Sequence, residues 1–341
     1  MAWANDNKTV FYSIKDESLR PYKVFKHLLG TDPAKDQEIY FEKDDIFEID
    51  IFKTKSDKYI FIDSDALLSS EIRYLDADQP DSGFKVMQPR QKDSKYSAEH
   101  SGDRFYILTN YKAKNFRLMS TPVGKPGIKN WKEVIPHRKD VLLEAFELFN
   151  EFFVLNERKN GLNQLRIISW KDKQEHYLDF GEATYTAYID VNLELSSEWL
   201  RFGYESLTTP ESYYDYNMRT REKKLLKQEE VLGNFNSSNY QAERLWATAK
   251  DGARIPISLV YRKGLVKNGE NPTLLYGYGS YGYSMDADFS SDRLSLLDRG
   301  FIYFNRFRKL NHRAHRETRR SQRIIWKDKR SCSVFVRSVA T

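Results

Sequence analysis

Apolar and polar residues alternate along most of residues 1–228, in short runs that are rich in aromatic and β-branched side chains. Alternation with a period of two residues is typical of half-buried β-strands. The runs come in pairs, and a short polar turn separates the first run of a pair from the second. The first runs are Thr9–Ile14, Tyr59–Asp63, Arg104–Thr109, Phe152–Asn156 and Trp199–Tyr204, and the second runs are Tyr22–His27, Glu71–Leu75, Asn115–Met119, Gln164–Ile168 and Ser212–Tyr216.

The pairs repeat at a nearly constant interval. One position in each second run is equivalent in the pattern, and the intervals between these positions are 49, 44, 49 and 48 residues. Units of about 48 residues with four strands each are typical of β-propeller blades. The sequence therefore predicts a mainly β chain with a partial β-propeller of about five four-stranded blades; a β-sandwich is the alternative. The equivalent positions are Val24, Arg73, Arg117, Arg166 and Tyr214.

The pattern changes after residue 228. Residues 231–240 are polar and rich in turn-forming side chains, which indicates a crossing between two domains. The apolar runs Glu243–Ala249 and Ile255–Tyr261 then flank the dipeptide Asp251-Gly252. An Asp-Gly turn between two such runs predicts a β-hairpin. We therefore assign residues 1–228 to the partial propeller and begin a second domain at residue 229.

The elements after this hairpin predict the opening of an α/β domain. Thr273–Tyr276 has the pattern of a short buried strand, and a glycine-rich loop follows at residues 277–282. Residues 290–299 have helical spacing that stops at Gly300, after which another apolar strand begins. Strand, loop, helix and strand in this order indicate that residues 229–304 are the incomplete start of an α/β domain.

The glycine-rich loop reads GYGSYG, which contains the G-x-G-x-x-G spacing of dinucleotide-binding loops. In that fingerprint a helix begins directly at the third glycine. Here residues 283–288 separate the loop from the helical pattern, so we expect no bound cofactor. A tight turn that needs unusual backbone angles explains the glycines.

The composition is that of a globular protein. Its 341 residues suggest about two domains, and 40% of them are hydrophobic. No apolar stretch reaches the ~18 residues of a membrane helix, and no signal peptide is visible. Cys332 is the only cysteine, which excludes an intrachain disulfide and favours a reducing compartment. We therefore expect a cytoplasmic protein with no membrane partner.

The basic charge of the chain is confined to its end. Residues 305–341 hold twelve Lys or Arg and two acidic residues, whereas the other 304 residues hold 43 basic and 47 acidic ones. The body is therefore mildly acidic, and we expect no nucleic-acid partner. The basic tail lacks an amphipathic period and is interpreted as out-of-frame or disordered sequence; an arm that binds phosphates is the alternative.

Few residues suggest catalysis or metal binding. His312 and His315 lie three residues apart, but Cys332 is distant and a fourth ligand is missing, so no metal site is expected. The G-x-S-x-G elbow, which carries the nucleophile of an α/β-hydrolase, does not occur in the 341 residues. The other histidines are scattered through the predicted propeller. They are His27, His100, His137 and His176.

Several phrases resemble the prolyl oligopeptidase family of serine peptidases, and within it the oligopeptidase B group. The likeness extends in register over about residues 9–302, and the phrase LLYGYGSYG is its most specific part. The phrases are LLYGYGSYG (274–282), RFGYESLTTPESYYDYN (201–217), NYQAERLWATAKDG (239–252) and KNFRLMSTP (114–122).

The resemblance implies a fold, an activity and one site residue. Family members combine a seven-bladed propeller with an α/β-hydrolase domain that carries Ser, Asp and His, and the oligopeptidase B group cleaves short peptides after Arg or Lys. Tyr278 matches the tyrosine whose hydroxyl helps to form the oxyanion hole, where one good donor contributes about 3 kcal/mol. The nucleophile, acid and base of the family have no match in this chain.

The resemblance also implies truncation at both ends. Five repeat units are predicted where the family has seven blades, and the sequence after Phe301 does not continue as the family does. We therefore expect a fragment of a serine oligopeptidase that does not turn over substrate as it stands. The alternative is a non-catalytic propeller that binds peptides.

Overall fold

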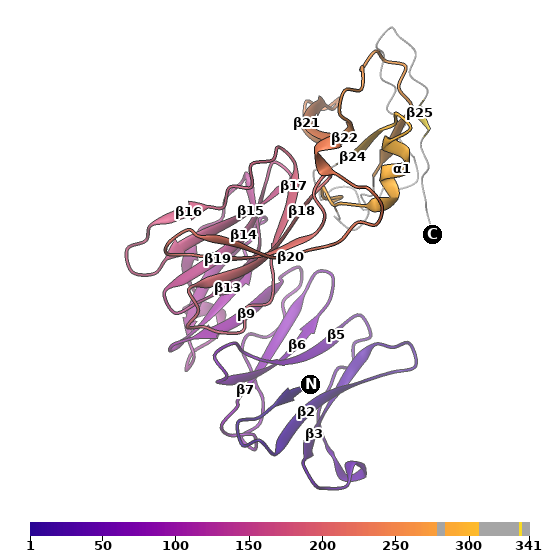
Figure 1. The fold of residues 1–341 in the computed structure, drawn as a ribbon. Helices are drawn as coiled ribbons and strands as arrows, with labels where there is room; N and C mark the ends of the chain where they lie inside the picture. The colour runs from indigo at the N-terminus through magenta and orange to yellow at the C-terminus, as the bar shows by residue number, and fades with distance from the viewer. Residues whose placement is uncertain (278–283, 307–333, 336–341) are drawn as a thin grey trace. The chain divides into compact units, whose positions relative to one another are not determined.

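The structure, a computed structural model, describes residues 1–277, 284–306 and 334–335. The described chain is almost entirely β, with only short helices (Figure 1). It divides into two compact units, which we describe separately. Unit 1 comprises residues 1–155, 168–174 and 192–198, and unit 2 comprises residues 156–167, 175–191 and 199–341.

Five four-stranded sheets follow one another along the chain, each with its strands in sequence order from one edge to the other. The first sheet contains β1 (Ala2–Trp3), β2 (Thr9–Lys15), β3 (Pro21–Leu28) and β4 (Gln37–Phe41), and the second contains β5 (Glu48–Lys53), β6 (Tyr59–Asp65), β7 (Ser70–Asp76) and β8 (Lys85–Val86). The third contains β9 (Tyr96–Ser101), β10 (Arg104–Thr109), β11 (Arg117–Pro122) and β12 (Lys132–Ile135). The fourth contains β13 (Val141–Leu148), β14 (Phe152–Lys159), β15 (Leu162–Ser169) and β16 (Glu175–Tyr177), and the fifth contains β17 (Tyr185–Ile189), β18 (Trp199–Ser206), β19 (Ser212–Asn217) and β20 (Lys223–Gln228).

The five predicted blades are confirmed by these sheets. Each predicted pair of runs forms the second and third strands of one sheet, so the recognised repeat is the central hairpin. The equivalent positions of the repeat all lie in third strands, as Val24 in β3 and Tyr214 in β19 illustrate. The outer strands are shorter or less regular, which explains why the sequence pattern shows them less clearly.

Alternate residues of one strand pack against different neighbouring sheets in unit 1. Ile60 and Ile62 of β6 belong to an apolar cluster that contains Phe11 of the first sheet. Phe61, which lies between them, belongs to another cluster with Phe105 of the third sheet. These three β6 side chains are 0% exposed, and each stabilises the fold by about 1.5–3 kcal/mol. The second sheet is thus covered on both faces.

Unit 2 contains a mixed sheet with the strand order β21-β22-β24-β23-β25. The first two strands form the hairpin predicted around Asp251-Gly252, and β22 pairs with β24 in antiparallel fashion. β23 runs parallel to both β24 and β25. The strands are β21 (Tyr240–Thr248), β22 (Arg254–Arg262), β23 (Thr273–Tyr276), β24 (Ile302–Arg306) and β25 (Val334–Phe335).

The helical segments are short. The helical pattern at residues 290–299 forms the 3-10 turn η5 (Ser291–Arg293) followed by α1 (Leu294–Leu297), and Gly300 ends the helix with a φ of 86°. Among the residues described, no helix is long and apolar enough to cross a membrane. Elsewhere in the described residues, 3-10 turns are found at η1 (Pro33–Lys35), η2 (Ile128–Asn130) and η3 (Ser237–Asn239).

The basic segment that begins at residue 305 is described only in part. β24 extends through Asn305 and Arg306, and Val334–Phe335 forms β25 beside β23. The other residues of this segment, among them His312, His315 and Cys332, lie outside the described residues. Asn305 is buried, and its amide donates to the carbonyl of Asp286 at 2.5 Å.

Gly203→Ala is expected to destabilise unit 2 by about 1–3 kcal/mol through overpacking. Gly203 of β18 pairs directly with Tyr188 of β17, and an added Cβ would lie 2.1 Å from Cζ of that ring. The ring must move, which breaks the hydrogen bond from its hydroxyl to Glu211. Urea unfolding of the variant and the wild type measures the loss.

Gly124→Ala is the matched control for this substitution. Nothing lies within 4 Å of a Cβ added to Gly124, and its φ is not positive. A substitution at such a compatible position leaves stability unchanged or raises it slightly. Equal stability of the two variants would contradict the proposed role of the Tyr188 ring.

Candidate functional site

The glycine-rich loop begins at the carboxyl end of β23. Tyr278, the residue assigned to the oxyanion hole by resemblance, lies outside the described residues together with residues 279–283. The strand that leads into the loop lies between β24 and β25 and is parallel to both. In sheets with parallel strands, ligands bind outside the carboxyl ends of the strands. The loop therefore starts at the edge of the sheet where a site is expected.

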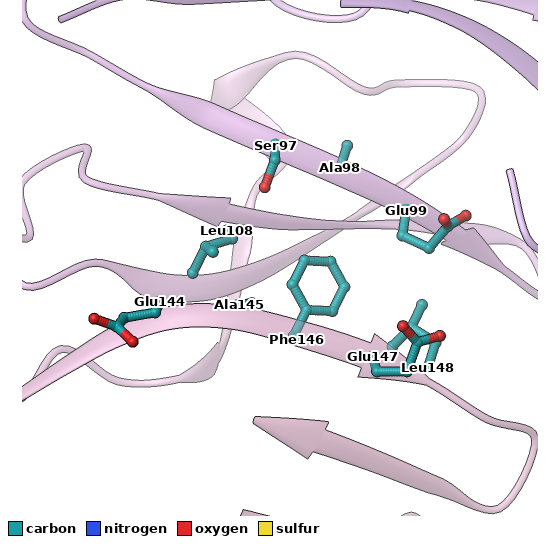
Figure 2. Close-up of a pocket in the computed structure, with 9 residues that line it drawn as sticks. All are labelled: Ser97, Ala98, Glu99, Leu108, Glu144, Ala145, Phe146, Glu147 and Leu148. Atoms are coloured by element: carbon teal, nitrogen blue, oxygen red, sulfur yellow. The ribbon is translucent and has the colours of Figure 1, made fainter. Parts of the chain in front are cut away.

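A pocket of about 200 Å³ lies in unit 1 between β9 of the third sheet and β13 of the fourth. Each of these strands is the first of its sheet and forms one of its edges. In Figure 2, Glu99 and Glu147 lie at one end of the pocket, Glu144 lies at the other, and the Phe146 ring is between them. The lining residues are Ser97, Ala98, Glu99, Leu108, Glu144, Ala145, Phe146, Glu147 and Leu148.

A lysine of the second sheet reaches the Glu147 end of this pocket. Lys55 lies in the turn between β5 and β6, and its side chain is only 7% exposed. Its Nζ donates to Glu147 Oε1 at 2.5 Å and to the carbonyl of Leu148 at 2.7 Å. The same Nζ lies 3.8 Å from the centroid of the Phe149 ring, a cation–π distance. One ammonium group therefore connects the second sheet to the fourth.

Glu99 connects the same turn to the third sheet. Its Oε1 accepts hydrogen bonds from the backbone N–H of His100 at 2.7 Å and from that of Lys55 at 3.2 Å. Burial nevertheless raises the pKa of Glu99 to about 7, because a charged carboxylate between these packed sheets loses its hydration. Burial also raises the pKa of Glu147, against the effect of the nearby Lys55 ammonium.

The pocket combines carboxyl groups with apolar surface. Three carboxyl groups line it, and Leu108 and Phe146 supply apolar surface for an aliphatic stem. No histidine and no cysteine is among its lining residues. Our sequence analysis did not identify Glu144 and Glu147 as site residues. The available signal was two carboxylates within the otherwise apolar run LLEAFELF.

In each of three propeller histidines, a ring nitrogen lies within hydrogen-bond distance of a side-chain oxygen. His27 Nδ1 lies 2.7 Å from Asp36 Oδ1, His100 Nδ1 lies 2.7 Å from Ser56 Oγ, and His176 Nε2 lies 2.9 Å from the Tyr216 hydroxyl. These pairs lie on different sheets and do not form a triad. Within residues 1–277, 284–306 and 334–335, no group of three or more His, Cys, Asp or Glu side chains is placed to hold a metal ion.

The successive four-stranded sheets define the class of this molecule as a β-propeller, which a mixed five-stranded sheet follows in the chain. Comparison with known proteins agrees with this class. Residues 1–229 match the prolyl oligopeptidase N-terminal beta-propeller domain. The chain belongs to the prolyl oligopeptidase family, as the sequence predicts.

Relatives and solved structures cover nearly the whole chain. Dipeptidyl aminopeptidase BI of Pseudoxanthomonas mexicana is 42% identical over 89% of the chain, and Protease 2 of Moraxella lacunata is 34% identical over 89%. Oligopeptidase B from Leishmania major matches 90% of the chain with a TM-score of 0.83 and 31% identity. Oligopeptidase B from Trypanosoma brucei, with covalently bound antipain, matches 90% with a TM-score of 0.82 and 33% identity.

The chain spans less than half the length of these proteins. It covers 42% and 43% of the two sequence relatives, and 44% and 45% of the two solved chains. The fold is therefore that of one part of the larger proteins.

Glu99→Gln is expected to raise stability above pH 7. The folded chain keeps the Glu99 proton up to about pH 7, whereas an ordinary glutamate releases it near pH 4.5. Between these values the native state binds more protons than the unfolded state, so stability falls as the pH rises. The glutamine oxygen can accept the same two backbone hydrogen bonds without a charge, which removes a loss of up to about 3 kcal/mol.

Thermal unfolding at about pH 5 and about pH 8 tests this expectation. The Tm of the variant should exceed that of the wild type by more at the higher pH. Glu17→Gln, which changes an exposed carboxyl, is the control and should follow the wild type at both values. If the Glu99 variant gains the same amount at both pH values, the protonated state assigned to Glu99 is wrong.

Proposed function

We propose that this chain is part of a serine oligopeptidase of the oligopeptidase B type, which hydrolyses short peptides after Arg or Lys. One combination of features supports the proposal most directly. Five propeller sheets precede a mixed sheet whose strand β23 contains the first three residues of the phrase LLYGYGSYG. Identities of 31% and 33% with two oligopeptidase B structures support the same group within the family.

In the proposed reaction a serine attacks the peptide carbonyl, a histidine takes the serine proton, and donors stabilise the oxyanion. Tyr278 would supply one of these donors from the glycine-rich loop, which is worth a factor of about 10² to 10³ in kcat. The G-x-S-x-G elbow does not occur in the 341 residues. The proposal is therefore that this chain contributes peptide binding and the Tyr278 hydroxyl, but no nucleophile.

The acidic pocket supports a preference for basic peptides. A guanidinium or ammonium group entering beside Glu144 would form a charge-assisted hydrogen bond with the carboxylate of that residue. The aliphatic stem of the same side chain would pack on Leu108 and Phe146. The proposed partners are short peptides with Arg or Lys. The single cysteine supports the cytoplasm as the proposed location.

A second candidate is a propeller that binds peptides without any peptidase role. The missing G-x-S-x-G motif favours this candidate. The mixed sheet favours the first candidate, because a propeller used only for binding needs no strands of an α/β domain.

Peptidase assays of the purified chain test the first candidate. N-blocked Arg and Lys p-nitroanilides should give no turnover, because the 341 residues contain no G-x-S-x-G motif to supply the nucleophilic serine. A free dipeptidyl p-nitroanilide belongs in the panel, because one relative is a dipeptidyl aminopeptidase. Measurable hydrolysis of any of these substrates by the chain alone would contradict the proposal.

Peptide binding tests the role of the pocket. Calorimetric titration with a blocked tripeptide centred on Arg should show binding, and the same peptide with norleucine should bind at least about tenfold more weakly. Glu144→Gln should reduce this preference, whereas Glu17→Gln, at an exposed position outside the pocket, should leave it unchanged. Equal binding of the two peptides would contradict a basic preference.

DNA sequencing across codons 290–341 separates the two candidates. A second reading frame that continues after Phe301 into an apolar strand and a later G-x-S-x-G elbow would support a peptidase gene. If no frame does so, the basic segment is genuine and the binding propeller becomes the better description.

A further inference from the structure

The segment Ser284–Ser290 follows the glycine-rich loop and precedes η5. It contains neither helix nor strand, so no backbone ladder holds it. We name it the connecting segment. All contacts described below lie within unit 2. Ala287 is 4% exposed and packs in an apolar cluster that contains Leu207, Val260, Leu297 and Tyr303. An irregular segment that is buried in this way needs other partners for its polar groups.

An arginine of the fourth sheet holds one end of the connecting segment. Arg158 of β14 is 12% exposed, and two of its guanidinium nitrogens donate to the two carboxylate oxygens of Asp286. The Nη2–Oδ2 distance is 3.1 Å. A two-pronged pairing of this kind fixes both the distance and the orientation of the carboxylate.

A glutamate of the fifth sheet holds the other end. Glu205 of β18 is half-buried, and its Oε2 accepts the backbone N–H of Phe289 at 2.8 Å. This bond satisfies a backbone donor for which the segment has no strand or helix partner. Asp286 and Phe289 are three residues apart, so Arg158 binds the first half of the connecting segment and Glu205 binds the second half.

Residues near the mixed sheet supply the opposing contacts. Asn305 of β24 donates to the carbonyl of Asp286, and Arg293 of η5 donates to the carbonyl of Asp288 at 2.6 Å and to its carboxylate at 2.7 Å. The connecting segment is therefore held from both sides. The carboxylate of Asp286 contacts a propeller strand, and its backbone carbonyl contacts a strand of the mixed sheet.

We propose that Arg158 and Glu205 are positioning residues, which fix the course of the connecting segment from the propeller side. The propeller strands then help to set where the chain runs as it leaves the glycine-rich loop. The inference concerns the described segment and does not depend on peptidase activity. Its failure would therefore leave the proposed function unaffected.

Hydrogen exchange at the Phe289 amide tests the role of Glu205. Glu205→Leu removes the acceptor, and exchange at this amide should accelerate about tenfold or more. Glu205→Gln keeps an acceptor oxygen and should retain most of the protection. Amides of β22 report on unit 2 as a whole and should stay unchanged in both variants. Equal acceleration by the Leu and Gln variants, or none in either, would overturn the role of Glu205.

A charge exchange tests the role of Arg158. Arg158→Met should accelerate exchange over residues 286–289, and Arg158→Lys should do so to a smaller extent, because lysine keeps the charge and loses the fork. The double variant Arg158→Glu with Asp286→Arg should restore protection. Arg117→Met, which breaks an ion pair with Glu133 in unit 1, is the control and should not alter these amides.

The outcomes distinguish positioning of the connecting segment from a general loss of stability in unit 2. Faster exchange confined to residues 286–289, with recovery in the double variant, supports the proposal. An equal acceleration at the β22 amides, or no recovery in the double variant, would overturn it. If the Met variant does not fold, the Lys variant and the double variant still give the comparison.

Discussion

A four-stranded sheet with apolar side chains on both faces must be covered on both, because each exposed face would leave large side chains in water. The second sheet shows how this requirement is met. Ile60 and Ile62 pack toward residues of the first sheet, while Phe61 between them packs toward the third. Because consecutive side chains of a strand point to opposite faces, the strand packs against a different sheet on each face, and the sheets stack. The pocket and the contacts of Lys55 lie in the seams, the spaces between neighbouring stacked sheets of unit 1.

The seams also explain where charge is found in unit 1. Lys55 leaves a turn of the second sheet and places its ammonium against Glu147 of the fourth, while its backbone N–H donates to Glu99 of the third. Buried charges cost free energy unless they are paired and hydrogen-bonded. Here the Lys55 ammonium pairs with Glu147, and Glu99 accepts two backbone hydrogen bonds. Burial raises the pKa of Glu99 to about 7, and the three glutamates give the pocket its acidic lining.

In unit 2 the polar side chains have a different role. The connecting segment has no regular secondary structure, so its course depends on side chains from other elements. Arg158 and Glu205 come from propeller strands, whereas Asn305 comes from the mixed sheet. A propeller strand can therefore hold a segment that the mixed sheet also contacts, without supplying a reacting group. This dependence gives a physical reason for finding both kinds of sheet in one polypeptide.

The sequence by itself determined the five blades, the hairpin at Asp251-Gly252 and the family, because strand periodicity, turn residues and the phrase LLYGYGSYG are all local. It did not reveal the acidic pocket or the positioning residues. Glu99 and Glu147 are 48 residues apart, and Arg158 and Asp286 are 128 apart. Each of these side chains looks like an ordinary polar position in its own strand or loop. Only the tertiary structure brings them together, because the strand register and the stacking of the sheets decide which residues share a seam.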